Sequence, residues 1–191
     1  LFRKSKKNSK NTVIKLSTGS NNIRQSNILY SGYKNNLSFG SNILLRNSDG
    51  HRYNADNKIN RIQSFIKFQD ENGRNYRFSY LLSDSELGHP GFDLEGSNKY
   101  RRSNRVSQYI QLQGFYALAT GLSMSHSIFL NKFKTNYSNR TDIPNWWLEG
   151  RTLDKNTEYN DTNWGLRSEV IFTQLSRWVL MMGYDFDYSK T

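Results

Sequence analysis

The sequence has no cysteine and only two prolines among its 191 residues. The absence of cysteine excludes disulfide scaffolds, zinc ribbons and thiol catalysis. No apolar run approaches the roughly 20 residues that a membrane-spanning helix needs, and residues 1–11 are basic but lack the apolar region of a signal peptide. We interpret residues 1–191 as a single domain. Either the protein is cytoplasmic or its export signal lies outside this sequence, and we favour the second interpretation.

Hydrophobic residues are also scarce, at 35% of the chain, whereas aromatic residues reach 14%. Disordered segments are usually poor in aromatic residues, so this composition favours a folded β-protein with two unlike faces. The formal net charge is +11. A solvated surface explains such a charge without any function; otherwise it indicates nucleic acid, anionic lipid or an anionic ligand as a partner.

Alternation with a period of two residues is the strongest signal. In residues 178–188 every second residue is apolar or aromatic, and the residues between them become small and acidic. A β-strand produces such a stripe automatically, and a helix does not. We predict a convex face that contacts lipid and a concave, polar face. The convex set is Trp164, Leu166, Trp178, Leu180, Met182, Tyr184 and Phe186. The concave set is Gly165, Arg167, Glu169, Gly183, Asp185 and Asp187.

The same alternation recurs upstream and gives about nine strands, most of them about ten residues or longer, which is the length of a tilted membrane-spanning strand. Clear strands fall at 37–46, 76–83, 110–118, 122–131 and 164–172, and weaker ones at 12–19, 23–33 and 58–69. A sandwich core would bury the polar set without partners, but a wet lumen accepts it. The sequence predicts an all-β, antiparallel, up-and-down segment of a transmembrane β-barrel. The segment is either an open, partial barrel or a closed one.

Connections between the predicted strands alternate in length. Tight links fall at 33–36, 70–74, 119–121 and 174–176, and the second contains Asn72-Gly73, a strong hairpin pair. Longer connections fall at 47–57, 84–104 and 135–161. If the strands run up and down, the long connections all lie at one end of the sheet. Long loops on one side and short turns on the other are typical of outer-membrane barrels.

Residue sets for catalysis or metal binding are not found. His51, His89 and His126 have no metal-ligand spacing to another His, Asp or Glu, and His126 interrupts an apolar stripe where we expect a membrane interface. No phosphate-binding loop or nucleophile elbow is present. The acidic residues of the concave set could be read as paired catalytic carboxylates. Acidic side chains that simply face water inside a barrel are the better interpretation. We expect no catalytic residue, no metal, no cofactor and no enzyme activity.

Nucleic acid is a weaker candidate partner. The basic residues within 3–10 resemble a nucleic-acid-binding arm, although we favour a solvated terminus. Elsewhere Arg77 alternates with Tyr76 and Phe78, which places rings and charge on opposite faces. A stacking platform needs both in one groove. We therefore expect no nucleic acid partner, and a soluble basic nucleic-acid-binding β-protein remains an alternative that solubility without detergent would favour.

Four segments carry a family resemblance: residues 16–21, 48–54, 87–91 and 182–187. The first resembles the opening barrel strand and short loop of TonB-dependent outer-membrane receptors. The next two resemble "SDGY-x-N" and "G-x-PG" segments in the loops after the third and fifth strands, and the last resembles a common "G-x-D/E" strand. The chain as a whole resembles the first part of such a barrel, particularly in cobalamin and ferric-siderophore receptors.

The resemblance implies a location in the bacterial outer membrane. In this family a barrel of about 22 strands encloses an N-terminal plug domain, and the TonB complex pulls on a short N-terminal box. The expected partners are outer-membrane lipid, lipopolysaccharide, the receptor's own plug domain and the TonB complex. The expected ligand is a scarce nutrient such as a ferric siderophore, haem or cobalamin. The chain would then be a fragment that lacks the plug and the remaining strands.

Basic and aromatic residues gather in the three long connections, which would face the outside. Such residues suit a negatively charged, partly flat ligand. The candidate ligand-binding residues are His51, Arg52, Tyr53, His89, Phe92, Lys99, Tyr100, Arg101, Arg102, Trp146, Trp147 and Arg151. Alternatively, the basic residues contact lipopolysaccharide phosphates or solvate the loops, while the tryptophans form an interfacial girdle. For the protein as a whole, the first alternative to a receptor is a complete small barrel, either a porin-like channel, in which a basic lumen would select anions, or an adhesin-type protein. An odd strand count and the missing signal sequence weigh against it, and a nucleic-acid-binding protein is less favoured still.

Overall fold

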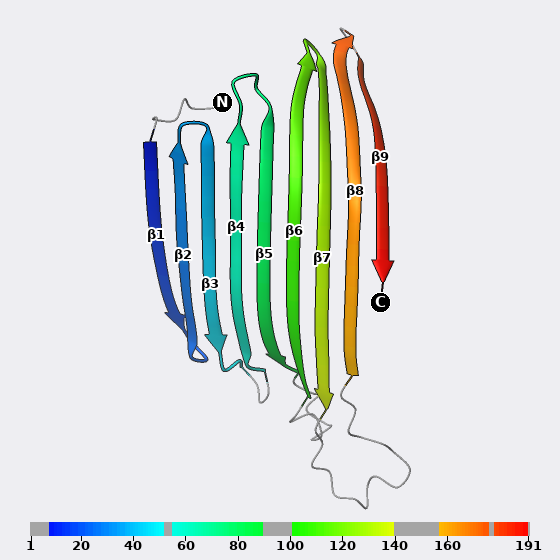
Figure 1. Cartoon of the computed structure of the whole chain (residues 1–191). Helices are drawn as coiled ribbons and strands as arrows, with labels where there is room; N and C mark the ends of the chain where they lie inside the picture. Colours follow the sequence, from blue (N-terminus) through cyan, green and yellow to red (C-terminus); the bar gives the residue numbers. More distant parts are fainter. Residues whose placement is uncertain (1–7, 52–54, 90–100, 140–156, 176–177, 191) are drawn as a thin grey trace, which may run out of the picture.

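The computed structural model describes residues 8–51, 55–89, 101–139, 157–175 and 178–190, where it forms a single nine-stranded sheet without helices (Figure 1). Every strand pairs antiparallel with its neighbours in sequence, so β1 and β9 are the two edges and the sheet does not close. The strands are β1 Asn8–Gly19, β2 Ile23–Lys34, β3 Leu37–Ser48, β4 Asn57–Gln69, β5 Asn75–Gly88, β6 Arg101–Ala119, β7 Leu122–Asn139, β8 Thr157–Leu175 and β9 Trp178–Lys190. The predicted all-β, up-and-down segment is confirmed.

The short turns after β2, β4 and β6 lie at one end of the sheet, which we call the turn end. Asn35, between β2 and β3, has a φ of 53°, and Gly73, between β4 and β5, has a φ of 78°. Both conformations suit tight hairpins. At the second turn the Asp70 carboxylate accepts a 2.8 Å hydrogen bond from the backbone N–H of Arg74. The connections after β3, β5 and β7 all leave from the opposite end, the loop end, as predicted.

The strands reach further toward the loop end than the alternation predicts. β6 and β8 have 19 residues each and β7 has 18. The predicted loops at 84–104 and 135–161 are therefore too wide. The hydrogen-bonded pairing of strands continues into the predicted loop, where Arg102 pairs with Gly88 on one side and with Ser138 on the other. Arg101 and Arg102, expected in a loop, are the first two residues of β6.

Direct cross-strand partners share a face, so the register assigns every strand residue to one of two faces. On the apolar face, one row crosses β1–β5 and another crosses β3–β9. The first is Ile14, Ile28, Ile43, Ile62 and Leu82. The second is Phe39, Ile66, Phe78, Leu112, Ile128, Leu166 and Phe186. These rows form the centre of an apolar belt.

The two residue sets predicted for β8 and β9 lie on opposite faces. Leu166 pairs with Phe186, whereas Arg167 pairs with Asp185. The division between the sets is confirmed for the side chains that the structure describes. The side chain of Trp178 lies outside them. Which face is convex stays a prediction.

A row of polar side chains bounds the apolar belt at the loop end. It crosses β1–β8 on the apolar face as Thr18, Arg24, Asn47, Lys58, Glu86, Asn104, Asn136 and Glu158. On some strands further polar residues of the same face, such as Asn60, Asp84 and Lys132, lie between this row and the apolar rows. We call this row the polar collar.

The sheet has no hydrophobic core among the described residues, since none of their hydrophobic side chains is buried. Most of the large apolar side chains with exposed surface lie on the apolar face; Ile14, for example, is 64% exposed and Ile128 is 55% exposed. No helix in the described part of the chain is long and apolar enough to cross a membrane. A single layer with one apolar face requires another apolar phase or partner against that face.

Candidate functional site

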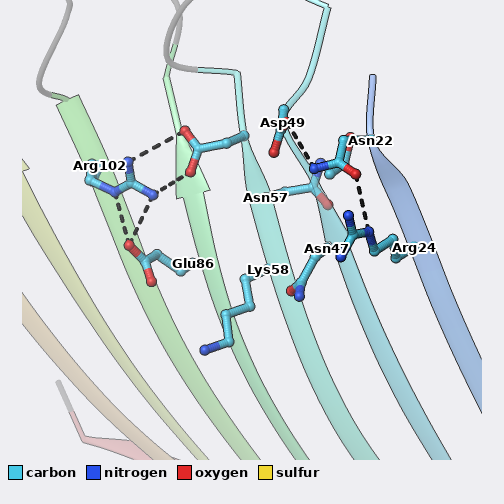
Figure 2. Close-up of a pocket in the computed structure, with 10 residues that line it drawn as sticks. Asn22, Arg24, Asn47, Asp49, Asn57, Lys58, Glu86 and Arg102 are labelled. Atoms are coloured by element: carbon cyan, nitrogen blue, oxygen red, sulfur yellow. Dashed lines mark hydrogen bonds and ion pairs between the residues drawn. The ribbon is translucent and has the colours of Figure 1, made fainter. Parts of the chain in front are cut away.

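A pocket of about 350 Å³ lies at the loop end of β2–β6 (Figure 2). Four of the residues that line the pocket belong to the polar collar, and Arg102 lies two residues from Asn104 of the collar, on the same face of β6. We call it the collar pocket. It is lined by Asn22, Arg24, Asn47, Ser48, Asp49, Asp56, Asn57, Lys58, Glu86 and Arg102. The pocket exists because the β1–β2 turn and the β3–β4 connection contribute polar side chains beside the strand ends.

Arg102 forms the shortest polar contacts in the collar pocket. Its guanidinium donates to the carboxylate of Asp56 at 2.5 Å and to that of Glu86 at 3.0 Å. Hydrogen bonding to Asp56 raises the pKa of Arg102, which lies beyond the apolar belt, and this effect outweighs partial desolvation. Two carboxylates neutralise this arginine, so it attracts a further anion weakly.

The opposite wall of the collar pocket is a chain of hydrogen bonds. Arg24 Nε donates to the side-chain oxygen of Asn22 at 3.1 Å, and the amide of Asn22 donates to the Asp49 carboxylate at 3.1 Å. Lys58 has no hydrogen bond or ion pair with another described residue, and no dashed line reaches it in Figure 2. Three cationic and three anionic side chains line the pocket, so their formal charges cancel.

A second cluster lies at the loop end on the polar face. His89 Nε2 and Ser103 Oγ are 2.8 Å apart and hydrogen-bonded. The His89 and Tyr137 rings are 6.2 Å apart, and the Tyr137 and Tyr159 rings meet edge to face at 5.9 Å. We call His89, Ser103, Tyr137 and Tyr159 the polar-face aromatic cluster. It combines ring surface with hydrogen-bonding groups, as a site for a flat polar molecule requires.

The predicted ligand-binding residues His89 and Arg102 lie on opposite faces of the sheet. Gly88 pairs with Arg102, whereas Leu87 pairs with Ser103, so His89 follows onto the face of Ser103. A ligand resting on one face contacts only one of them. His51 is exposed in the β3–β4 connection, and the side chain of Arg101 is not among those described. The remaining predicted residues lie outside the described residues: Arg52, Tyr53, Phe92, Lys99, Tyr100, Trp146, Trp147 and Arg151.

Sequence reasoning missed Tyr137 and Tyr159 of the aromatic cluster and both carboxylate partners of Arg102. Tyr137 follows Phe133 and Phe129 at intervals of four residues on the polar-face phase of β7. Aromatic residues out of phase with the apolar stripe were therefore an available signal. Asp56 carried no such signal, because its contact with Arg102 spans 46 residues.

Unpartnered polar atoms are concentrated on the polar face. Every buried side-chain N or O atom without a hydrogen bond, among the described residues, belongs to a strand position of that face. These residues are Asn27, Asn42, Arg46, Asn57, Asn75 and Asn163. On the apolar face, by contrast, the hydroxyls of Ser41 and Ser64 satisfy each other at 3.0 Å. These asparagines and this arginine make the second face polar, and a polar face suits contact with water or a polar surface.

No group of three or more metal-binding side chains occurs in the described part of the chain. The polar face does hold an ion pair between Arg167 and Asp185 at 2.5 Å, and a 2.9 Å hydrogen bond from Gln111 to Ser127. These contacts link β6 to β7 and β8 to β9.

Neither a family model, nor a curated protein, nor a solved structure matches the chain.

Proposed function

We propose that this chain forms part of the barrel wall of a TonB-dependent receptor in the bacterial outer membrane, which takes up a scarce nutrient such as a ferric siderophore, haem or cobalamin. The observation that carries the membrane part of this proposal is the apolar belt. It continues from strand to strand on one face and gives way to polar residues toward the loop end. Lipid stabilises such a belt, and headgroups stabilise such a boundary.

The hydrogen bonding of each face supports the same arrangement. Hydrocarbon offers no partner for a polar group, so a lipid-facing surface must satisfy its own hydroxyls. Ser41 and Ser64 do so within the belt. On the other face lie Arg46 and several asparagines, polar side chains that a wet lumen or an enclosed polar domain accepts.

The nutrient part of the proposal rests on the family resemblance and on the polar-face aromatic cluster. Tyr137, Tyr159 and His89 lie at the loop end, where a molecule from outside enters. We assign nutrient contact to this cluster rather than to Arg102, because Arg102 is neutralised by carboxylates and lies on the face that meets lipid.

Nutrient uptake by cells that produce the intact receptor containing this chain tests this function, since a barrel segment without its plug and remaining strands is not expected to transport by itself. The probes are a ferric siderophore, haem and cyanocobalamin, each supplied to cells with and without TonB. We expect one probe to accumulate only when TonB is present. Replacing Tyr137 and Tyr159 by alanine is expected to weaken binding of that probe at least about fivefold, because buried aromatic contacts often contribute more than 1 kcal/mol.

The control for that variant is Tyr184→Ala on the apolar face, which leaves the aromatic cluster intact. Heat-modifiable gel mobility verifies that each barrel has assembled. Accumulation of small anions that does not depend on TonB would favour the porin-like alternative and contradict the receptor. Unchanged binding in the double variant would remove the cluster from the nutrient site.

A further inference from the structure

Three lysines lie on the apolar face at the loop end of β7–β9. Lys132 pairs with Thr162, and Thr162 pairs with Lys190. The two lysines therefore flank one residue in a single row, with Cα atoms about 10 Å apart at the usual strand spacing. Lys134 lies two residues further along β7 on the same face. We call Lys132, Lys134 and Lys190 the lysine patch.

The lysine patch keeps a net positive charge. Lys134 Nζ lies 3.0 Å from a carboxylate oxygen of Glu158, and that oxygen also accepts a 2.7 Å hydrogen bond from Asn160. Lys132 and Lys190 are exposed and have no hydrogen bond or ion pair with another described residue. Three positive charges and one negative charge leave +2, whereas the formal charges of the collar pocket cancel.

Aromatic side chains lie directly below the lysine patch. The next row toward the turn end contains Leu130, Trp164 and Tyr188. The Trp164 and Tyr188 rings are 5.9 Å apart, and both side chains are almost half exposed. Tryptophan and tyrosine with lysine above them are characteristic of the boundary between hydrocarbon and headgroups. Long lysine stems reach from this boundary into the headgroup layer.

We propose that the lysine patch binds the phosphate of an anionic lipid headgroup. This inference rests on the proposed function, because it needs the apolar face to contact lipid. An ammonium group offers three donors and a compact charge, which suits phosphate oxygens. Lys132 and Lys190 approach one phosphate from two strands, while the row of Trp164 and Tyr188 contacts the start of the acyl chains.

Vesicle binding of the full chain tests the inference. One vesicle population is phosphatidylcholine alone, and the other is phosphatidylcholine mixed with phosphatidic acid. The test variant carries Lys132→Gln, Lys134→Gln and Lys190→Gln. The control variant loses the same charge from the polar face through Lys15→Gln, Lys67→Gln and Arg105→Gln. Circular dichroism confirms the β-structure of each protein before binding is measured.

We expect the unmodified chain to prefer phosphatidic acid vesicles at low salt. A lysine near an anionic surface contributes about fivefold in affinity, so the test variant is expected to lose at least about tenfold of that preference. Its binding to phosphatidylcholine alone stays unchanged. The control variant keeps the preference, and salt weakens it only where the lysine patch is intact.

Different failures have different meanings. A test variant that keeps its preference, or a control variant that loses it equally, overturns the lysine patch while leaving membrane insertion in place. Failure of the unmodified chain to bind phosphatidylcholine vesicles overturns the proposed membrane function and this inference together. Loss of the preference in inorganic phosphate, at an ionic strength where sodium chloride leaves the preference intact, identifies a free-phosphate site and also overturns the headgroup assignment.

Discussion

Replacing Ile128 by arginine is expected to destabilise membrane assembly by roughly 2–4 kcal/mol, the cost of a charge near the midplane of a barrel's lipid face. Ile128 lies in a central row of the apolar belt, where its direct partners are Leu112 and Leu166. Its side chain is 55% exposed, so arginine meets no protein group that could neutralise it there. The readout is the fraction of chain that reaches the heat-modifiable, folded form in vesicles across a urea series.

The matched control places arginine on the same strand but on the other face. Ser125 pairs directly with Glu169, so Ser125→Arg gains a nearby carboxylate in a wet environment. Exposed ion pairs of this kind change stability by less than about 1 kcal/mol. Equal assembly of the Ile128→Arg and Ser125→Arg proteins would show that the apolar face does not meet lipid.

Gly165→Ala is the second substitution with a large expected effect, a loss of about 1–3 kcal/mol in the free energy of unfolding. A Cβ at Gly165 would lie 2.6 Å from the Phe129 ring and 2.6 Å from the backbone oxygen of Phe186, and it would also meet the Asp187 carboxylate. The ring can turn, but the backbone oxygen belongs to the β8–β9 ladder. Relief therefore requires β9 to shift.

Urea unfolding in detergent micelles measures this loss, and Gly19→Ala is the control. A Cβ at Gly19 meets Ile23 at 3.7 Å, an ordinary contact, so this change is expected to leave the midpoint within experimental error or raise it slightly. Coincident urea midpoints for the two alanine variants would mean that the close approach at Gly165 does not affect the stability of the fold.

The strands could be predicted where the two faces differ in polarity. In β9 the alternation of Met182, Tyr184 and Phe186 with small and acidic residues predicts both the strand and which of its residues share a face. His126, which interrupts the stripe in β7, fits the same scheme. Its ring lies 5.9 Å from Tyr116, in an aromatic line near the turn end, and a membrane interface at that end, as we propose, would tolerate a polar ring.

The loop-end parts of β6–β8 could not be predicted by the same rule. Near the polar collar both faces are polar, as Ser103 and Asn104 illustrate, so the alternation disappears although the hydrogen-bonded ladder continues. The candidate site depends on register for the same reason. The separation of His89 from Arg102, and the contact of Arg102 with Asp56, both follow from pairings between distant segments.

The most direct test of the central claim is the accessibility of spin labels along β7. Because the chain has no cysteine, each introduced cysteine carries a unique label. The apolar-face positions are Met124, Ile128 and Leu130, and the polar-face positions are Ser123, Ser125 and Asn131. In vesicles, we predict that the first three labels collide mainly with oxygen, which concentrates in lipid, and the last three mainly with a water-soluble nickel chelate. Shielding of the first three from both reagents, or contact of all six with the chelate, would contradict a lipid-facing belt.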